Sequence, residues 1–178
     1  MIRVFLVLLL VPFWARAQEA PSKDGGVVST GVVAKSYQAL ARRLHLKGVS
    51  LSEQSRYPEA LKVLKEAYSL NPNHPEISLS LAYVHKLLGN RAAAERRLRA
   101  AIKLAPGRVE AAQKLAALLA TNKATPYELA EASTLLERVR EQLGNRADII
   151  RQQAQVAALR GLENEAIEFY RHLLKLQP

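Results

Sequence analysis

The sequence predicts an all-α protein, an α-solenoid of four helix-turn-helix repeats with about eight helices. Three observations lead to this prediction. The chain is similar to itself at a spacing of about 34 residues. Hydrophobic residues make up 49% of the chain but aromatic residues only 6%, so that alanine and leucine supply most of the apolar mass, which favours closely packed helices. Prolines and glycines recur at the places where such helices would end.

The first 17 residues have the features of a secretory signal peptide. Arg3 gives a positive start, an apolar run from Val4 to Trp14 follows, and Ala15-Arg16-Ala17 ends the segment with small residues. We therefore predict cleavage before Gln18 and export to the periplasm or beyond. The apolar run is shorter than the roughly 20 residues that a membrane-spanning helix needs. The alternative is a segment that is retained as a weak anchor.

Residues 18–32 are predicted to form a flexible leader, because glycine, serine and proline are frequent there and no periodic apolar face is present. Loss of the signal peptide would reduce the net charge from +10 to about +8. A basic protein favours acidic partners, and export makes an acidic protein or an anionic lipid a better candidate than nucleic acid. The alternative is a basic surface without a specific partner.

Residues 33–178 are predicted to form one repeat domain, with repeats at about 41–74, 75–108, 109–146 and 147–178. The segments Arg56–Pro72, Asn90–Pro106 and Leu162–Pro178 share a frame. Each has an alanine, a larger apolar residue four places later, a small or apolar residue three places after that, and a proline five places further on. Because proline cannot continue a helix, it marks the end of each second helix.

Small residues recur where the two helices of a pair would approach closely. These are Gly48, Ala82, Ala116 and Ala154 in the first helices, and Ala60, Ala94, Ala132 and Ala166 in the second. Leu64, Leu98, Leu136 and Tyr170 are expected to fill the space beside them. Gly89 and Gly161 are expected to form the turn within a pair.

This pattern resembles the tetratricopeptide repeat from Ala41 to the last residue. There are departures, such as Lys47 where the family prefers leucine and Gly144 in place of a closing proline. The third repeat also has four additional residues near 121–128, which should lengthen a turn or one helix. The resemblance implies a groove lined by the first helices that binds extended peptides or partner helices.

The resemblance also implies which side chains face that groove. They are Arg42, His45, Val49, Ser52, Glu76, Leu79, Tyr83, Lys86, Glu110, Gln113, Ala117, Ala120, Asp148, Arg151, Gln155 and Ala158. Tyr83 is the only aromatic residue among them and is a candidate anchor for a partner side chain, unless it packs against the neighbouring repeat. Some family members hold a C-terminal carboxylate with a lysine and an asparagine. Those places hold His45 and Val49 here, so no such binding is predicted.

Two further surfaces are candidates. Arg96, Arg99 and Lys103 recur at helical spacing and would form a basic stripe that docks on an acidic protein or an anionic lipid, unless they form only a solvated face. Solenoids usually end in a polar cap, whereas this sequence ends on apolar residues. Phe169, Leu173 and Leu176 would then contact a partner or a second copy, while Val33, Tyr37 and Leu40 would extend and cap the first helix.

No catalytic, cofactor or metal site is predicted. The chain has no cysteine and only two aspartates, and its four histidines are not at ligand spacing. It contains no metalloprotease, phosphate-loop or serine-hydrolase motif.

These observations favour an exported adaptor or scaffold that helps assemble an envelope complex, such as a pilus or a secretion system. Two alternatives remain open. One is a self-assembling module that pairs through its C-terminal end. The other is a basic binder of anionic lipid or polysaccharide.

Overall fold

The computed structural model describes residues 30–176. The predicted signal peptide and most of the predicted leader lie outside these residues. Within them the chain forms eight helices and no strand, which confirms the all-α solenoid. The helices are α1 (Thr30–Glu53), α2 (Tyr57–Leu70), α3 (Pro75–Leu87), α4 (Arg91–Leu104), α5 (Val109–Leu119), α6 (Pro126–Leu143), α7 (Ala147–Leu159) and α8 (Glu163–Leu176).

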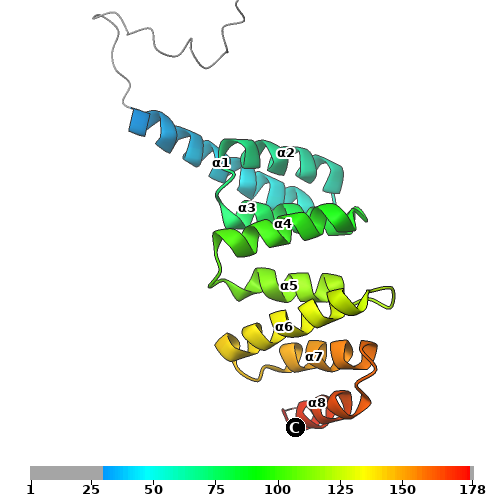
Figure 1. The fold of residues 1–178 in the computed structure, drawn as a ribbon. Coiled ribbons are helices and arrows are strands. Elements are labelled where there is room, and N and C mark those ends of the chain that lie inside the picture. Colours follow the sequence, from blue (N-terminus) through cyan, green and yellow to red (C-terminus); the bar gives the residue numbers. More distant parts are fainter. Residues whose placement is uncertain (1–29, 177–178) are drawn as a thin grey trace, which may run out of the picture.

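The helices pair along the chain and stack in order from α1 to α8 (Figure 1). α1 packs on α2, α3 on α4, α5 on α6 and α7 on α8, and each pair also contacts the next. We call the side formed by α1, α3, α5 and α7 the first-helix face, and the side formed by α2, α4, α6 and α8 the second-helix face. Helices α3, α5 and α7 begin at the first residues of the predicted second, third and fourth repeats.

The core consists of the small and branched residues that the repeat frame indicates. Ala60, Ala94 and Ala132 have no exposed surface, and Leu64 and Leu136 are also fully buried. Small residues at these places let the two helices of a pair approach closely, so that leucines fill the remaining space.

Tyr170 differs from the leucines at the same place in the repeat. The residue is 45% exposed, so the expectation that it fills core space is wrong. Leu136 is covered because α7 follows it in the stack, whereas no described helix follows α8. Burial at this place therefore depends on the neighbouring repeat.

Three of the four turns within a pair contain a left-handed backbone residue. Gly89 and Gly161 have φ values of 74° and 73°, which confirms the turns predicted there. Glycine adopts this conformation without the steric cost that a Cβ atom brings. Ser55 adopts it in the first pair, with φ of 61°.

The additional residues of the third repeat lengthen both the turn and the second helix. The connection between α5 and α6 covers residues 120–125, and α6 has 18 residues where α2 and α4 have 14. Thr125 and Glu128 form a capping box that fixes the start of α6.

Helix α1 begins at Thr30, inside the predicted 18–32 leader and three residues before the predicted domain start. Its 24 residues extend beyond α2, which has 14 (Figure 1). Val33, Tyr37 and Leu40 do extend the helix, but they are exposed, because α2 is too short to reach them. None of the described helices is both long and apolar enough to cross a bilayer.

Candidate functional site

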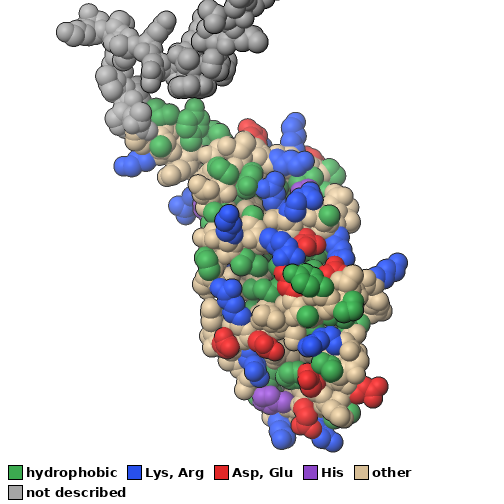
Figure 2. All heavy atoms as spheres, viewed as in Figure 1, with side chains coloured by type: hydrophobic (Ala, Val, Ile, Leu, Met, Phe, Trp, Pro, Cys, Tyr) green, Lys and Arg blue, Asp and Glu red, His purple; other side chains and the backbone are tan. Residues whose placement is uncertain are grey.

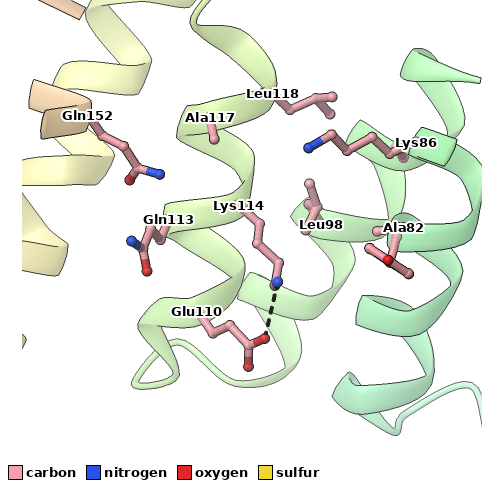
Figure 3. A pocket seen from close by; sticks show the side chains of 11 residues that line it. Ala82, Lys86, Leu98, Glu110, Gln113, Lys114, Ala117, Leu118 and Gln152 are labelled. Atoms are coloured by element: carbon pink, nitrogen blue, oxygen red, sulfur yellow. Dashed lines mark ion pairs between the residues drawn. The ribbon is translucent and has the colours of Figure 1, made fainter. Parts of the chain in front are cut away.

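A hollow of about 310 Å³ opens on the first-helix face between α3 and α5 (Figure 3). Its apolar residues come from three helices, with Ala82 on α3, Ala94 and Leu98 on α4, and Ala117 and Leu118 on α5. Its polar lining consists of Tyr83, Lys86, Glu110, Gln113, Lys114 and Gln152. An apolar floor with a few polar groups around it is the common design of a binding pocket.

Tyr83 is half-exposed, with 50% of the residue's surface accessible. It therefore lies open at the hollow and is not packed away against the neighbouring repeat. An aromatic ring with a hydroxyl group offers both apolar contact and a hydrogen bond to a partner.

The charges around the hollow are unequal. The Lys114 Nζ atom lies 3.4 Å from Glu110 Oε1, as the dashed line in Figure 3 shows. Lys86 forms no ion pair with any described residue. The rim thus keeps one positive charge without a partner among the described residues.

Two glutamines extend the hollow towards α7. Gln113 Nε2 donates a hydrogen bond of 3.0 Å to Asp148 Oδ2. This bond, together with those from Arg146, holds the pKa of Asp148 below its usual value. In contrast, Gln152 Oε1 is buried and has no hydrogen-bond partner among the described residues, so its acceptor capacity is unused.

Some of the predicted groove residues instead bond to other side chains of the stack. His45 Nε2 lies 2.8 Å from Ser80 Oγ, joining α1 to α3, and burial lowers the pKa of this imidazole. Glu76 is bonded to Arg108, and its Oε2 lies 2.6 Å from His74 Nδ1. Side chains on this face thus hold the stack together as well as facing outwards.

The remaining predicted groove residues do not line the hollow. Leu79, Ser52 and Ala120 are buried, Val49 and Asp148 are partly buried, and Arg42, Arg151, Gln155 and Ala158 are exposed elsewhere. The hollow brings together only Tyr83, Lys86, Glu110, Gln113 and Ala117 of the predicted set.

Lys114 and Gln152 were missed by the sequence reasoning because they lie outside the four groove places of the family. For Lys114 a signal was available, since it stands four residues after Glu110 and can pair with it along one helix face.

The predicted basic stripe on α4 is not a row of free cations. Arg99 donates hydrogen bonds to Glu131 Oε1 at 2.5 Å and to Glu95 Oε1 at 2.9 Å. These two carboxylates raise the pKa of Arg99, mainly through Glu131. Arg96 lies instead beside Lys65, His85 and Arg97, in a second hollow. Lys103 is exposed outside both hollows.

Of the three residues predicted for a C-terminal interface, Leu176 is exposed and the other two are not. Leu173 is only 8% exposed and Phe169 is partly buried, because both pack within their own pair of helices. The apolar residues that α8 does expose are Ile167, Tyr170, Leu174 and Leu176. The first three follow helical spacing and define one stripe, which we call the α8 stripe.

The described residues offer few side-chain arrangements that are suited to catalysis or metal binding. Residues 30–176 contain no cluster of three histidines or acidic residues placed to hold a metal ion. Among the described residues, the one serine–histidine hydrogen bond, between Ser80 and His45, is partly buried between two repeats, and no acidic residue is hydrogen-bonded to His45.

Comparison with known proteins agrees with this architecture. The tetratricopeptide repeat profile matches residues 51–119. No curated protein has a sequence that matches the chain significantly. Among solved structures, MamA is similar over 82% of this chain and 77% of its own, with a TM-score of 0.69 and 18% identity.

Two other solved structures are similar at 22% identity. YrrB, described as a tetratricopeptide protein with an unusual peptide-binding site, has a TM-score of 0.69 over 78% of this chain and 69% of its own. The first tetratricopeptide domain of Spaghetti (RPAP3), solved with the HSP90 peptide SRMEEVD, has a TM-score of 0.62 over 68% of this chain and 93% of its own. At identities this low, the similarity shows a shared fold only.

Proposed function

We propose that this chain, whose residues 51–119 match the tetratricopeptide repeat profile, is an exported scaffold that binds a protein segment in the hollow between α3 and α5. The observation that carries the proposal is the half-exposed Tyr83 beside an apolar floor that contains Leu98 and Leu118. Large rigid aromatic residues next to a desolvated pocket are typical anchors in protein interfaces.

The lining indicates what kind of segment fits. A volume of about 310 Å³ has room for one or two apolar side chains, which would contact Leu98 and Leu118. Lys86 would pair with an acidic residue of the same segment. Gln152 Oε1 would accept a hydrogen bond from its backbone. The proposed ligand is thus a peptide or helix with an apolar residue next to an acidic one.

Two of the similar structures support peptide binding on this architecture. YrrB is described as having a peptide-binding site, and the RPAP3 domain is bound to a peptide that contains two consecutive glutamates. The path of a peptide in this chain is set by its own hollow, since the identities are only 22%.

The signal-peptide pattern of residues 1–17 supports export, and export supports a role in assembling an envelope complex such as a pilus or a secretion system. Expression from the full-length coding sequence, followed by cell fractionation and N-terminal sequencing, tests export. A mature protein that starts at Gln18 in the periplasm or the medium is expected. Recovery of the intact chain from the cytoplasm would contradict export.

The binding proposal is tested by affinity capture from an envelope extract with matched tyrosine variants. Tyr83→Ala removes the proposed anchor. Tyr127→Ala is the control, because Tyr127 is 77% exposed on α6 and lies outside the hollow. We expect a protein that is retained by the native chain and by Tyr127→Ala but lost with Tyr83→Ala. An identical set of proteins retained by all three would contradict the hollow as the binding site.

The α8 stripe supports a second candidate function, self-association. Tyr170 stands at the place where Leu64, Leu98 and Leu136 are covered by the next repeat, so the same kind of surface is open on α8. A second copy could cover it. Light scattering over a range of concentrations should then show a dimer that Leu174→Glu dissociates. A monomer at high concentration would exclude this candidate.

A further inference from the structure

The second-helix face has its own hollow, of about 400 Å³, between α2 and α4. It is lined by Lys65 of α2, His85 of α3, and Ala93, Arg96 and Arg97 of α4. Figure 2 shows Lys and Arg side chains gathered around a histidine over these helices. None of the three cations forms an ion pair with a described residue. Three positive charges thus converge there without a protein carboxylate.

The hollow between α2 and α4 lacks an acidic residue that the next two repeats have at the corresponding place. On the same face, Arg99 of α4 pairs with Glu131 of α6. By the repeat frame, Lys65 on α2 corresponds to Arg99, and Ala93 on α4 corresponds to Glu131. The cation of the inter-repeat pair is therefore present between α2 and α4, but alanine replaces its acidic partner. The space that a carboxylate would fill is part of the hollow.

His85 is a polar residue at an apolar place. The corresponding residues of the first and third repeats are Leu51 and Leu119, both buried in the core. His85 is only 8% exposed, yet its imidazole lines the hollow, and its Nδ1 atom is buried without a hydrogen-bond partner among the described residues. A buried polar atom without a partner is costly unless a ligand or water supplies one.

The position of Arg97 is fixed by Tyr68. The Arg97 Cζ atom lies 4.1 Å from the centre of the Tyr68 ring, a cation–π contact. This contact orients the guanidinium group and forms no N–H hydrogen bond to an oxygen, so the donors of Arg97 stay available.

We propose that this hollow binds a phosphate group, either inorganic phosphate or the terminal phosphate of a phosphomonoester. A phosphate carries up to two negative charges and several acceptor oxygens, which match three cations and an imidazole better than the single charge of a carboxylate does. Lys65 contributes a point charge, Arg96 and Arg97 contribute directed N–H donors, and His85 contributes the hydrogen bond that closes the inner side.

The test is a titration of the protein, expressed from the full-length coding sequence, with inorganic phosphate at low ionic strength, followed by NMR shifts of the backbone amides and of the His85 ring. Saturable shifts confined to α2, the end of α3 and the start of α4 are expected. Absence of saturable shifts in the native protein would overturn the proposal.

Matched variants separate a built site from general charge. Arg96→Ala and Lys65→Ala should each weaken phosphate binding by about tenfold or more. Lys103→Ala and Lys62→Ala remove the same charges from the same helices outside the hollow and should change binding less than about twofold. Equal weakening by both pairs would mean that the binding is diffuse electrostatic attraction, which contradicts the proposal.

Ala93→Glu is a further variant. It places on α4 the glutamate that the corresponding position of α6, Glu131, has. It should abolish phosphate binding while the protein stays folded, because the new carboxylate would pair with Lys65. Ala92→Glu adds the same charge to an exposed neighbouring place outside the hollow and should retain binding. If Ala93→Glu bound phosphate as well as Ala92→Glu does, the proposal would be overturned.

Vesicles distinguish the two sources of the phosphate group. Vesicles that contain phosphatidic acid expose a phosphomonoester. Vesicles that contain phosphatidylglycerol are also anionic, but their headgroup is a phosphodiester. Binding to the former alone, with displacement by inorganic phosphate, would identify a lipid headgroup as the source. If the protein binds inorganic phosphate saturably but binds neither kind of vesicle, the source is a soluble phosphate or phosphomonoester.

Discussion

Leu64 of α2 occupies the place that a Cβ atom on Gly48 of α1 would need. Such an atom would lie 2.5 Å from Leu64 Cγ and 2.6 Å from Leu64 Cδ2. Leu64 is fully buried, so its branched end has little room to move. The first pair of helices therefore depends on the absence of a side chain at one position of α1.

Replacement of Gly48 with alanine should destabilise the protein. The overlap with Leu64 costs about 1–3 kcal/mol, and the better helix propensity of alanine offsets about 1 kcal/mol of that cost. We expect a net loss of up to about 2 kcal/mol in the free energy of unfolding, measured by urea denaturation.

Gly107→Ala is the matched control for this prediction. Gly107 lies in the connection between α4 and α5, has no left-handed backbone angle, and has no atom within 4 Å of an added Cβ. This substitution should be neutral or slightly stabilising. A Gly48→Ala protein as stable as Gly107→Ala would show that Leu64 can move aside.

The capping box of α6 should make the protein sensitive to acid. Glu128 Oε2 accepts hydrogen bonds from the Thr125 backbone N–H at 2.7 Å and from Thr125 Oγ1, and these bonds lower the pKa of Glu128. Because the folded state has the lower pKa, the stabilisation is present above about pH 4.5, the ordinary value for glutamate, and is lost as the pH falls through the folded pKa.

Glu128→Gln tests this pH dependence. The amide oxygen can still accept the bond from the Thr125 backbone but does not titrate, so the free energy of unfolding should fall less steeply below pH 4.5 than in the native protein. Thr125→Ala should cost about 1 kcal/mol at neutral pH. Identical pH profiles for native and Glu128→Gln proteins would contradict the assignment.

The pair of Arg99 and Glu131 should contribute modestly to the coupling of the second and third repeats. The contact is bidentate, with N–O distances of 2.5 and 2.9 Å, but the Arg99 side chain is 45% exposed. Exposed pairs of this kind contribute up to about 1 kcal/mol. A double-mutant cycle of Arg99→Ala and Glu131→Ala should give a coupling energy of that size. No coupling would mean that Glu95 alone holds Arg99.

Much of the fold could be predicted because the repeat frame is local. The frame places the starts of α3, α5 and α7 at Pro75, Val109 and Ala147, where the structure has them. It could not predict that Tyr170 is exposed while Leu136 is buried, because both stand at the same place and only the following helix distinguishes them.

The candidate site was less predictable because it depends on contacts between repeats. The four groove places of the family indicate a face, but His45 and Glu76 on that face bond to residues of a neighbouring repeat or connection. Arg96 and Arg99 look alike in sequence, three residues apart on one helix. Glu131, 32 residues further along the chain, binds Arg99 and leaves Arg96 in the second hollow.

Adjacent leucines on α8 should respond in opposite ways to truncation. Leu173 is 8% exposed and packs within its pair of helices, whereas Leu174 is 72% exposed on the α8 stripe. Leu173→Ala should lower the free energy of unfolding by about 2 kcal/mol or more, because it removes buried methyl groups and leaves a cavity. Leu174→Ala should change it by less than about 0.5 kcal/mol when the protein is monomeric. Urea denaturation at several protein concentrations measures both effects. A loss for Leu174→Ala that grows with concentration would show that a second copy covers the α8 stripe, because association stabilises only the folded form.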